Sequence, residues 1–81
     1  MKIPVQLWSY FTELAGTSQV ELELPPGAKI DDLLTLLYQR HPRLGAMRNS
    51  TLVAVGVDYQ GSSYVLQEGD EVSLFPPVQG G

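Results

Sequence analysis

The sequence predicts a single α+β domain in which one main helix packs on one face of a mixed sheet. Two observations favour this class. Apolar and polar residues alternate in segments near both chain ends, as they do in half-buried strands, whereas residues 30–37 carry apolar side chains at helical spacing. The 81 residues fit one domain, and a composition of 43% hydrophobic and 17% charged residues is typical of a chain that folds.

The N-terminal segment predicts two antiparallel strands joined by a helical turn. Residues 3–10 place alternate aliphatic side chains on one face and Trp8 on the other. Residues 11–15 form one helical turn, and Gly16 ends it. Residues 20–24 alternate between apolar and acidic side chains, so they form a half-buried second strand. The short connection between the two strands favours antiparallel pairing.

The main helix begins near residue 30, where the apolar spacing changes from a period of 2.0 to one of about 3.6 residues. Four apolar residues follow the pattern of a helix that buries one stripe: Ile30, Leu33, Leu34 and Leu37. Asp31 and Asp32 lie in the first turn, where carboxylates stabilise the positive end of the helix dipole. Pro42 cannot continue the helix and ends it.

The C-terminal half predicts three further strands. A loop over residues 43–51 leads to an apolar, β-branched strand at 52–57, a very short strand at 64–66 and a last strand at 71–75. The resulting order, ββαβββ, resembles that of the ubiquitin-like β-grasp fold, in which one helix covers one face of a mixed sheet. In that fold the first and last strands are adjacent and parallel.

Composition disfavours several classes of function. Cysteine is absent, which removes disulfides, thiolate nucleophiles and cysteine-based metal sites. The formal net charge is −4 and the five basic residues are spread along the chain, so nucleic acid and anionic membranes are disfavoured as partners. No apolar run reaches the ~18 residues of a membrane helix, and no leader peptide opens the chain. We therefore expect a cytoplasmic protein that binds neither nucleic acid nor membrane.

The ionisable side chains form no recognisable catalytic or metal site. Asp31 and Asp32 are adjacent on the predicted helix and point apart, which favours stabilisation of the helix start over metal binding or acid–base catalysis. His41 lies at the helix C-terminus, where a cation is favoured, and no nucleophile motif accompanies it. Residues 68–71 lack the run of ligands of a calcium loop and indicate a solvated turn.

The chain end has the properties of a reactive tether. We expect residues 1–75 to form the β-grasp domain and residues 76–81 to form an extended, flexible tail. The Pro-Pro pair at the base of the tail cannot continue a ladder and favours an extended conformation. The terminal Gly-Gly pair has no Cβ to keep it out of a narrow channel. Six residues at ~3.3 Å each reach ~20 Å, so the terminal carboxylate is the group available for chemistry.

Three segments of the sequence together carry a resemblance to a known family. Residues 66–72 read L-Q-E-G-D-E-V, and residues 75–81 read F-P-P-V-Q-G-G. These two segments resemble the L-x-x-G-D-E-V and P-P-V-x-G-G patterns of the MoaD-type small subunit of molybdopterin synthase, a ubiquitin-like sulfur carrier of the MoaD/ThiS family. Residues 11–16 are similar to the helical turn that follows the first strand in that family. The resemblance spans essentially the whole chain, and the tail pattern is its most specific part.

The resemblance implies a role for the C-terminal Gly81. An E1-like adenylyltransferase would adenylate its carboxylate, and sulfur from a sulfurtransferase or other persulfide donor would displace AMP to leave a thiocarboxylate. The tail would then enter the active site of the large catalytic subunit of a heterotetrameric synthase and donate sulfur to cyclic pyranopterin monophosphate, in molybdenum cofactor biosynthesis. The chain would hold no permanent cofactor, only transient AMP and sulfur, and would have no activity alone.

The expected partner-binding residues are two aromatic side chains and the tail. Trp8 and Phe75 lie on the outward parity of the first and last strands, where large aromatic side chains are typical interface anchors. The alternative is that their neighbours bury them. The tail residues that the resemblance places in the partner are Pro76, Pro77, Val78, Gln79 and Gly80.

Three other functions share this scaffold and stay open. The chain could carry sulfur for thiamine, tRNA thiolation or another sulfurated product, although the Pro-Pro pair and the first helical turn disfavour the thiamine carrier, which usually lacks both. It could be a ubiquitin-like modifier that forms isopeptide bonds with lysines. It could also be an interaction module with an inert tail.

Overall fold

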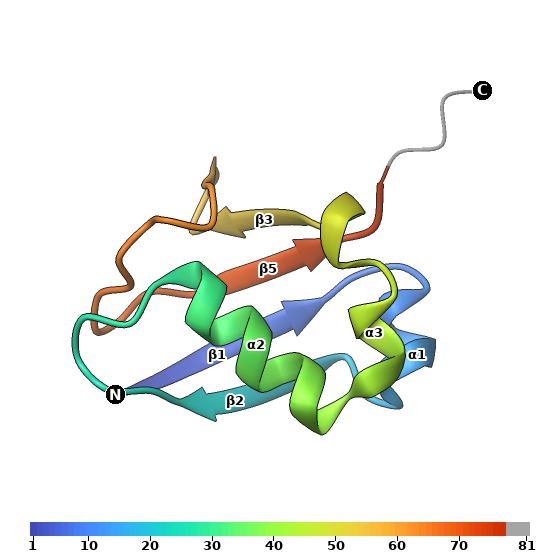
Figure 1. Ribbon diagram of the computed structural model, residues 1–81. Helices are drawn as coiled ribbons and strands as arrows, with labels where there is room; N and C mark the ends of the chain where they lie inside the picture. Colours follow the sequence, from blue (N-terminus) through green and yellow to red (C-terminus); the bar gives the residue numbers. More distant parts are fainter. Residues whose placement is uncertain (78–81) are drawn as a thin grey trace.

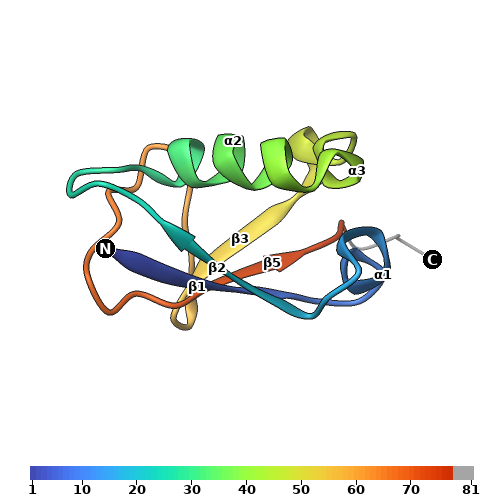
Figure 2. The same cartoon turned by 90° about the horizontal axis from the view of Figure 1, so that it is seen from below.

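The computed structural model describes residues 1–77, which form a five-stranded sheet with helices on one face (Figures 1 and 2). The strands are β1 (Lys2–Leu7), β2 (Gln19–Glu23), β3 (Leu52–Val55), β4 (Asp58–Tyr59) and β5 (Val72–Phe75). The helices are α1 (Phe11–Ala15), α2 (Ile30–Arg40), α3 (Pro42–Gly45) and the 3₁₀ helix η1 (Arg48–Ser50).

The sheet order is β2-β1-β5-β3-β4, so β5 is the central strand. β1 pairs antiparallel with β2 and parallel with β5, as the sequence predicts. Figure 2 shows α2 lying across one face of the sheet, while the opposite face carries none of the described helices. The predicted β-grasp fold, with one main helix on one face of a mixed sheet, is confirmed.

The core lies between α2 and the inner face of the sheet. The predicted helical stripe is buried in full: Ile30, Leu33, Leu34 and Leu37. It packs in one cluster with inward-facing strand residues such as Val5, Leu22 and Val72. At the start of α2, the Asp32 carboxylate accepts a hydrogen bond from the Lys29 backbone N–H at 2.9 Å, which confirms that this acidic side chain stabilises the helix start.

The predicted fourth strand at residues 64–66 is wrong. Val65 makes only an isolated bridge to Lys29, and the fourth strand is β4. The predicted third strand also ends early, at Val55. The reason is a two-residue hairpin turn: Val55 pairs with Asp58, and Gly56 between them has φ 61°, which suits the positive φ of such turns.

Two other predicted boundaries also differ from the structure. The first strand ends at Leu7 rather than residue 10, because Ser9 adopts φ 56° and turns the chain into α1. Residues 43–51, predicted as a loop, contain most of α3 and all of η1. Pro42 ends α2 as expected, but it also occupies the first turn of α3, where its missing N–H costs no hydrogen bond. These short helices depend on burial of Leu44 rather than on a long apolar pattern.

Tyr38 of α2 is half-buried, and its hydroxyl is the one buried side-chain polar atom among residues 1–77 that lacks a hydrogen-bond partner. The Arg48 guanidinium lies 5.7 Å from the centre of the Tyr38 ring and forms an ion pair with Asp31. Burial raises the pKa of the Tyr38 hydroxyl above its usual 10.0, while the nearby Thr51 hydroxyl and the Arg48 charge oppose the rise. The Thr51 hydroxyl donates its own proton to the Met47 carbonyl oxygen.

Tyr38→Phe is expected to raise the free energy of unfolding by about 1 kcal/mol at neutral pH, because it removes a buried hydroxyl without a partner. The folded state holds the Tyr38 proton more tightly than the unfolded state. The stability that this proton gives the unsubstituted chain is therefore present below about pH 10 and is lost as the pH rises through the folded pKa. The advantage of the variant should therefore widen above about pH 10. Denaturant unfolding across this pH range measures both effects, with the exposed Tyr59→Phe as control. A destabilised Tyr38→Phe would contradict the prediction.

Candidate functional site: the open face of the sheet and the base of the tail

The face of the sheet opposite α2 carries an exposed group of three aromatic side chains where β5 ends. Along β5, Val72 and Leu74 are buried whereas Ser73 and Phe75 are half-buried on the open face. Trp8 and Tyr59 lie beside Phe75, and we call these three residues the aromatic cluster. Trp8 is 46% exposed and Tyr59 is 69% exposed, so the neighbours of Trp8 do not bury it. Exposed aromatic side chains in a group are typical of an interaction surface.

The rings of the aromatic cluster contact one another across the strands. Trp8 stacks on Phe75 with 5.7 Å between ring centres and 12° between planes. Tyr59 meets Phe75 edge-on at 6.4 Å and 71°. On β3, Leu52 is the register partner of Phe75 and is 39% exposed. Phe75 is therefore held on several sides at the last position of the central strand.

Register brings the cluster together from distant parts of the sequence. Leu7 pairs with Leu74, and the Trp8 backbone N–H donates to the Leu74 carbonyl oxygen at 3.2 Å, which places Trp8 beside Phe75. The sequence correctly predicts that these two aromatics share the outward face. It does not identify Tyr59, because Tyr59 joins the face only through the β3–β4 hairpin, which the strand pattern missed. The glycine at position 56 was the sequence signal that could have indicated this hairpin.

The tail begins directly at the aromatic cluster. Pro76 and Pro77 follow Phe75 and are half-buried. Four residues with predicted roles lie outside the described residues: Val78, Gln79, Gly80 and the reactive Gly81. The partner-binding roles of Trp8, Phe75 and the tail stay predictions. The base of the tail lies beside the aromatic cluster, because Pro76 directly follows Phe75.

Two residues that the sequence raised as candidate catalytic or metal sites, Asp70 and His41, stabilise the fold instead. Across residues 1–77, no group of three or more His, Cys, Asp or Glu side chains is arranged to hold a metal ion. The Asp70 carboxylate accepts hydrogen bonds from the Gln67 backbone N–H at 2.8 Å and from the Tyr64 hydroxyl at 2.9 Å, so it closes the turn before β5. That hydrogen bond to Asp70 is the main cause of a raised Tyr64 pKa. His41 caps α2 through its backbone N–H, which donates to the Leu37 carbonyl oxygen.

Within residues 1–77, every helix is too short to cross a bilayer, and α2 is the longest at 11 residues.

Comparison with known proteins gives full-length matches. A family model described as the ThiS family matches residues 5–81. The molybdopterin synthase sulfur carrier subunit of Chlamydomonas reinhardtii is 32% identical, and the match covers 100% of both chains. Among solved structures, the small archaeal modifier protein 1 of Haloferax volcanii is 27% identical with a TM-score of 0.89 and 100% coverage of both chains.

A second solved structure is also similar over nearly its whole length. Subunit 1 of a molybdopterin converting factor, the description given to a Pyrococcus furiosus protein, is 31% identical with a TM-score of 0.87, covering 96% of this chain and 99% of that one. The resemblance carried by residues 66–72 and 75–81 is therefore confirmed. Because the family model and the full-length relative agree with the fold, the chain belongs to the ThiS family of ubiquitin-like sulfur carriers.

Proposed function

We propose that this chain is the cytoplasmic sulfur carrier subunit of a molybdopterin synthase. The observation that carries the proposal is that the central strand β5 ends in the exposed aromatic cluster and leads directly into the Pro-Pro-Val-Gln-Gly-Gly end. A partner that covers the aromatic cluster would receive the tail at a defined place on its own surface. The relatives named molybdopterin synthase sulfur carrier subunit support this assignment over other products.

The proposed chemistry takes place on the terminal carboxylate. The Gly81 carboxylate attacks the α-phosphorus of ATP on an E1-like enzyme, and pyrophosphate leaves. The terminal sulfur of a persulfide donor then attacks the acyl carbon and displaces AMP, which forms an acyl disulfide. A second thiol, on the donor or from a thiol reductant, cleaves the S–S bond and is oxidised to a disulfide, and the terminal group is released as a thiocarboxylate. This chain supplies the nucleophile, while the catalytic side chains belong to the large subunit. Threading the tail into that subunit delivers the sulfur at high effective concentration.

A ubiquitin-like modifier is the second candidate function. The small archaeal modifier protein 1 of Haloferax volcanii has the same fold over 100% of both chains at 27% identity. Such a modifier would use the same activated Gly81 carboxylate, but a lysine amine would displace AMP and form an isopeptide bond. The two functions therefore differ in which nucleophile attacks the acyl-adenylate.

Incubation with the cognate E1-like enzyme, ATP, a persulfide donor and a thiol reductant is expected to exchange one terminal oxygen for sulfur. Intact-mass spectrometry should show one oxygen-to-sulfur increment, and fragmentation should place it on Gly81. The absence of cysteine means that the adduct cannot be a cysteine persulfide, so the assay has no competing cysteine signal. Addition of the large subunit and cyclic pyranopterin monophosphate should return the mass to that of the carboxylate.

The other outcomes of this assay assign the other functions. A sulfurated chain that never discharges to the pterin indicates a carrier for thiamine, tRNA thiolation or another product. Isopeptide conjugates without a thiocarboxylate indicate the modifier. An unchanged mass with a competent cognate enzyme leaves an interaction module with an inert tail.

A further inference from the structure

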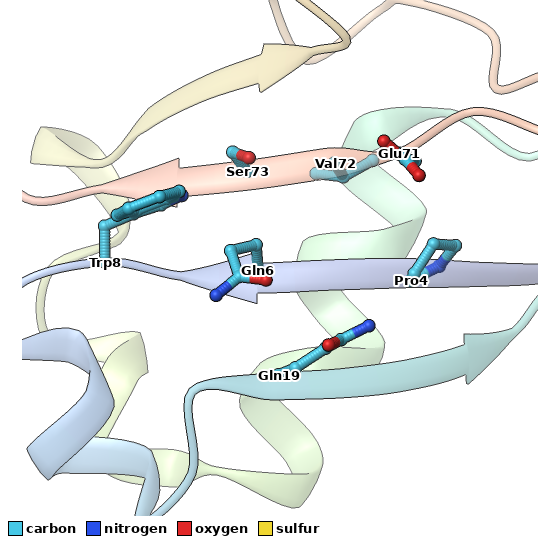
Figure 3. Close-up of a pocket in the computed structure, with 7 residues that line it drawn as sticks. All are labelled: Pro4, Gln6, Trp8, Gln19, Glu71, Val72 and Ser73. Carbon is cyan, nitrogen blue, oxygen red and sulfur yellow. The ribbon is translucent and has the colours of Figure 1, made fainter.

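A shallow groove of about 360 Å³ runs along the open face of the sheet, beside the aromatic cluster. Figure 3 shows its lining side chains, which come from β1 and the residue after it, from β2, and from the start of β5 and the residue before it. The residues that matter below are Pro4, Gln6, Trp8, Gln19, Glu71 and Ser73. Trp8 belongs to both surfaces, so a partner that covers the aromatic cluster also meets the groove.

The two ends of the groove differ in chemistry. Trp8 lies at one end, next to Phe75, and Glu71 lies at the other end, next to Pro4 (Figure 3). Glu71 and Phe75 are four residues apart on one extended chain, which corresponds to about 13 Å at ~3.3 Å per residue. The aromatic end is therefore next to the base of the tail, and the acidic end is about 13 Å away from it.

The net charge at the far end of the open face is negative, because three carboxylates lie there with one lysine. On β2, Glu21 and Glu23 project from the open face opposite Pro4 and Lys2. Lys2 is the one basic side chain on that face of the strands. In residues 1–77 the one ion pair joins Arg48 and Asp31 on the helical side, so the Glu71 carboxylate is in no described ion pair.

The floor of the groove offers hydrogen-bonding groups that the described chain does not use. The side chains of Gln6, Gln19 and Ser73 make no hydrogen bond to any other residue within the described range 1–77. Amide and hydroxyl groups of this kind can pair with the backbone and polar side chains of an incoming polypeptide. The groove thus combines an apolar end, a polar floor and an acidic end.

We propose that this groove docks a segment of the large synthase subunit that carries a basic side chain about 13 Å from an apolar one, with the basic side chain paired to Glu71. The inference rests on the proposed function. Charge complementarity favours a basic partner segment, since the groove adjoins Glu21, Glu23 and Glu71 on a chain of net charge −4.

This pairing would set the direction in which the carrier docks. With the apolar partner residue on Trp8 and the basic one on Glu71, the base of the tail faces the partner's active site. The reversed arrangement would place the Glu71 carboxylate against an apolar side chain of the partner and leave that carboxylate unpaired. Glu71 therefore acts as a positioning residue, and it acts through binding rather than through chemistry.

Charge reversal at Glu71 tests the proposal. Glu71→Lys is expected to weaken binding to the cognate large subunit about 10-fold at low salt in a calorimetric titration, and Glu71→Gln about 3-fold, as for loss of an interfacial charge pair. The affinity of the unmodified chain should fall as salt rises, and that of Glu71→Lys should fall less. The matched control is Glu68→Lys, which changes the net charge equally but lies in the exposed turn outside the groove; it should stay within about 2-fold.

Sulfur transfer in the same mixtures separates this proposal from the proposed function. Once the large subunit is saturating, thiocarboxylated Glu71→Lys should transfer sulfur at the normal rate, because its defect is in binding. Equal affinities for Glu71→Lys and Glu68→Lys, with normal sulfur transfer by the unmodified chain, would overturn the proposal that the groove docks the large subunit. The carrier function would remain supported. If the unmodified thiocarboxylate neither binds nor discharges, both proposals fail. Thermal unfolding of each variant verifies that it keeps the fold, as expected because Glu71 is exposed.

Discussion

Deletion of Gly81 is expected to abolish sulfur transfer while the free energy of unfolding stays unchanged. The shortened chain still ends in a carboxylate, but the reactive carbon is displaced by one residue, about 3.3 Å. A misplacement of ~1 Å at a reacting centre can lower the reaction rate about 100-fold. The rates of adenylation by the activating enzyme and of sulfur transfer in the large subunit are therefore expected to fall at least that much. Among the described residues the buried core ends at Leu74, so we expect the deletion to leave the free energy of unfolding unchanged.

Two further variants make this deletion diagnostic. Gln79→Ala changes the same segment without moving the terminus and should keep most of the transfer. Gly81→Ala keeps the chain length but adds a Cβ, so its loss measures how narrow the receiving channels are. Thermal unfolding and complementation of a carrier-deficient strain provide the two measurements. A deletion variant that still restores cofactor synthesis would show that the tail hypothesis is wrong.

Trp8→Ala is expected to weaken binding of the large subunit by about 2 kcal/mol, which is roughly 30-fold in Kd. Trp8 is 46% exposed and stacks on Phe75 beside the start of the tail, so its ring is available to fill a pocket on a partner. Removal of a half-exposed ring should cost little folding stability. Phe75→Ala should weaken binding similarly, although its contacts with Trp8 and Tyr59 are also lost.

Calorimetric titration of the large subunit measures this effect, and an apolar residue outside the cluster provides the control. Val65 is 41% exposed and lines a different groove, with Met1 and Pro26, so Val65→Ala should bind normally. Trp8→Phe keeps an aromatic ring and should recover part of the affinity. Unchanged affinity for both Trp8→Ala and Phe75→Ala would remove the aromatic cluster from the interface.

The sequence by itself determined the main elements and the family. The helical spacing of residues 30–37 and the alternation in residues 20–24 identify α2 and β2 because each pattern is local: which face a side chain takes depends only on the period of its own element. The pattern of residues 75–81 indicated the carrier chemistry through its resemblance to the tail of the family, and that resemblance is also a local feature of the sequence. The outward parity of Trp8 and Phe75 followed from the same local rule.

Only the tertiary structure decided which of these side chains meet. The place of Tyr59 beside Phe75 depends on contact between segments far apart in the chain, and the short helix at Leu44 depends on burial of that side chain in the shared core. The fourth strand is a local hairpin with β3, but its position at the sheet edge follows from the pairing of β3 with β5. The groove with Trp8 at one end and Glu71 at the other likewise needs the parallel register of β1 and β5. Periodicity fixes the face that a residue occupies but not its neighbour across the sheet, because that neighbour is selected by the packing of the whole core.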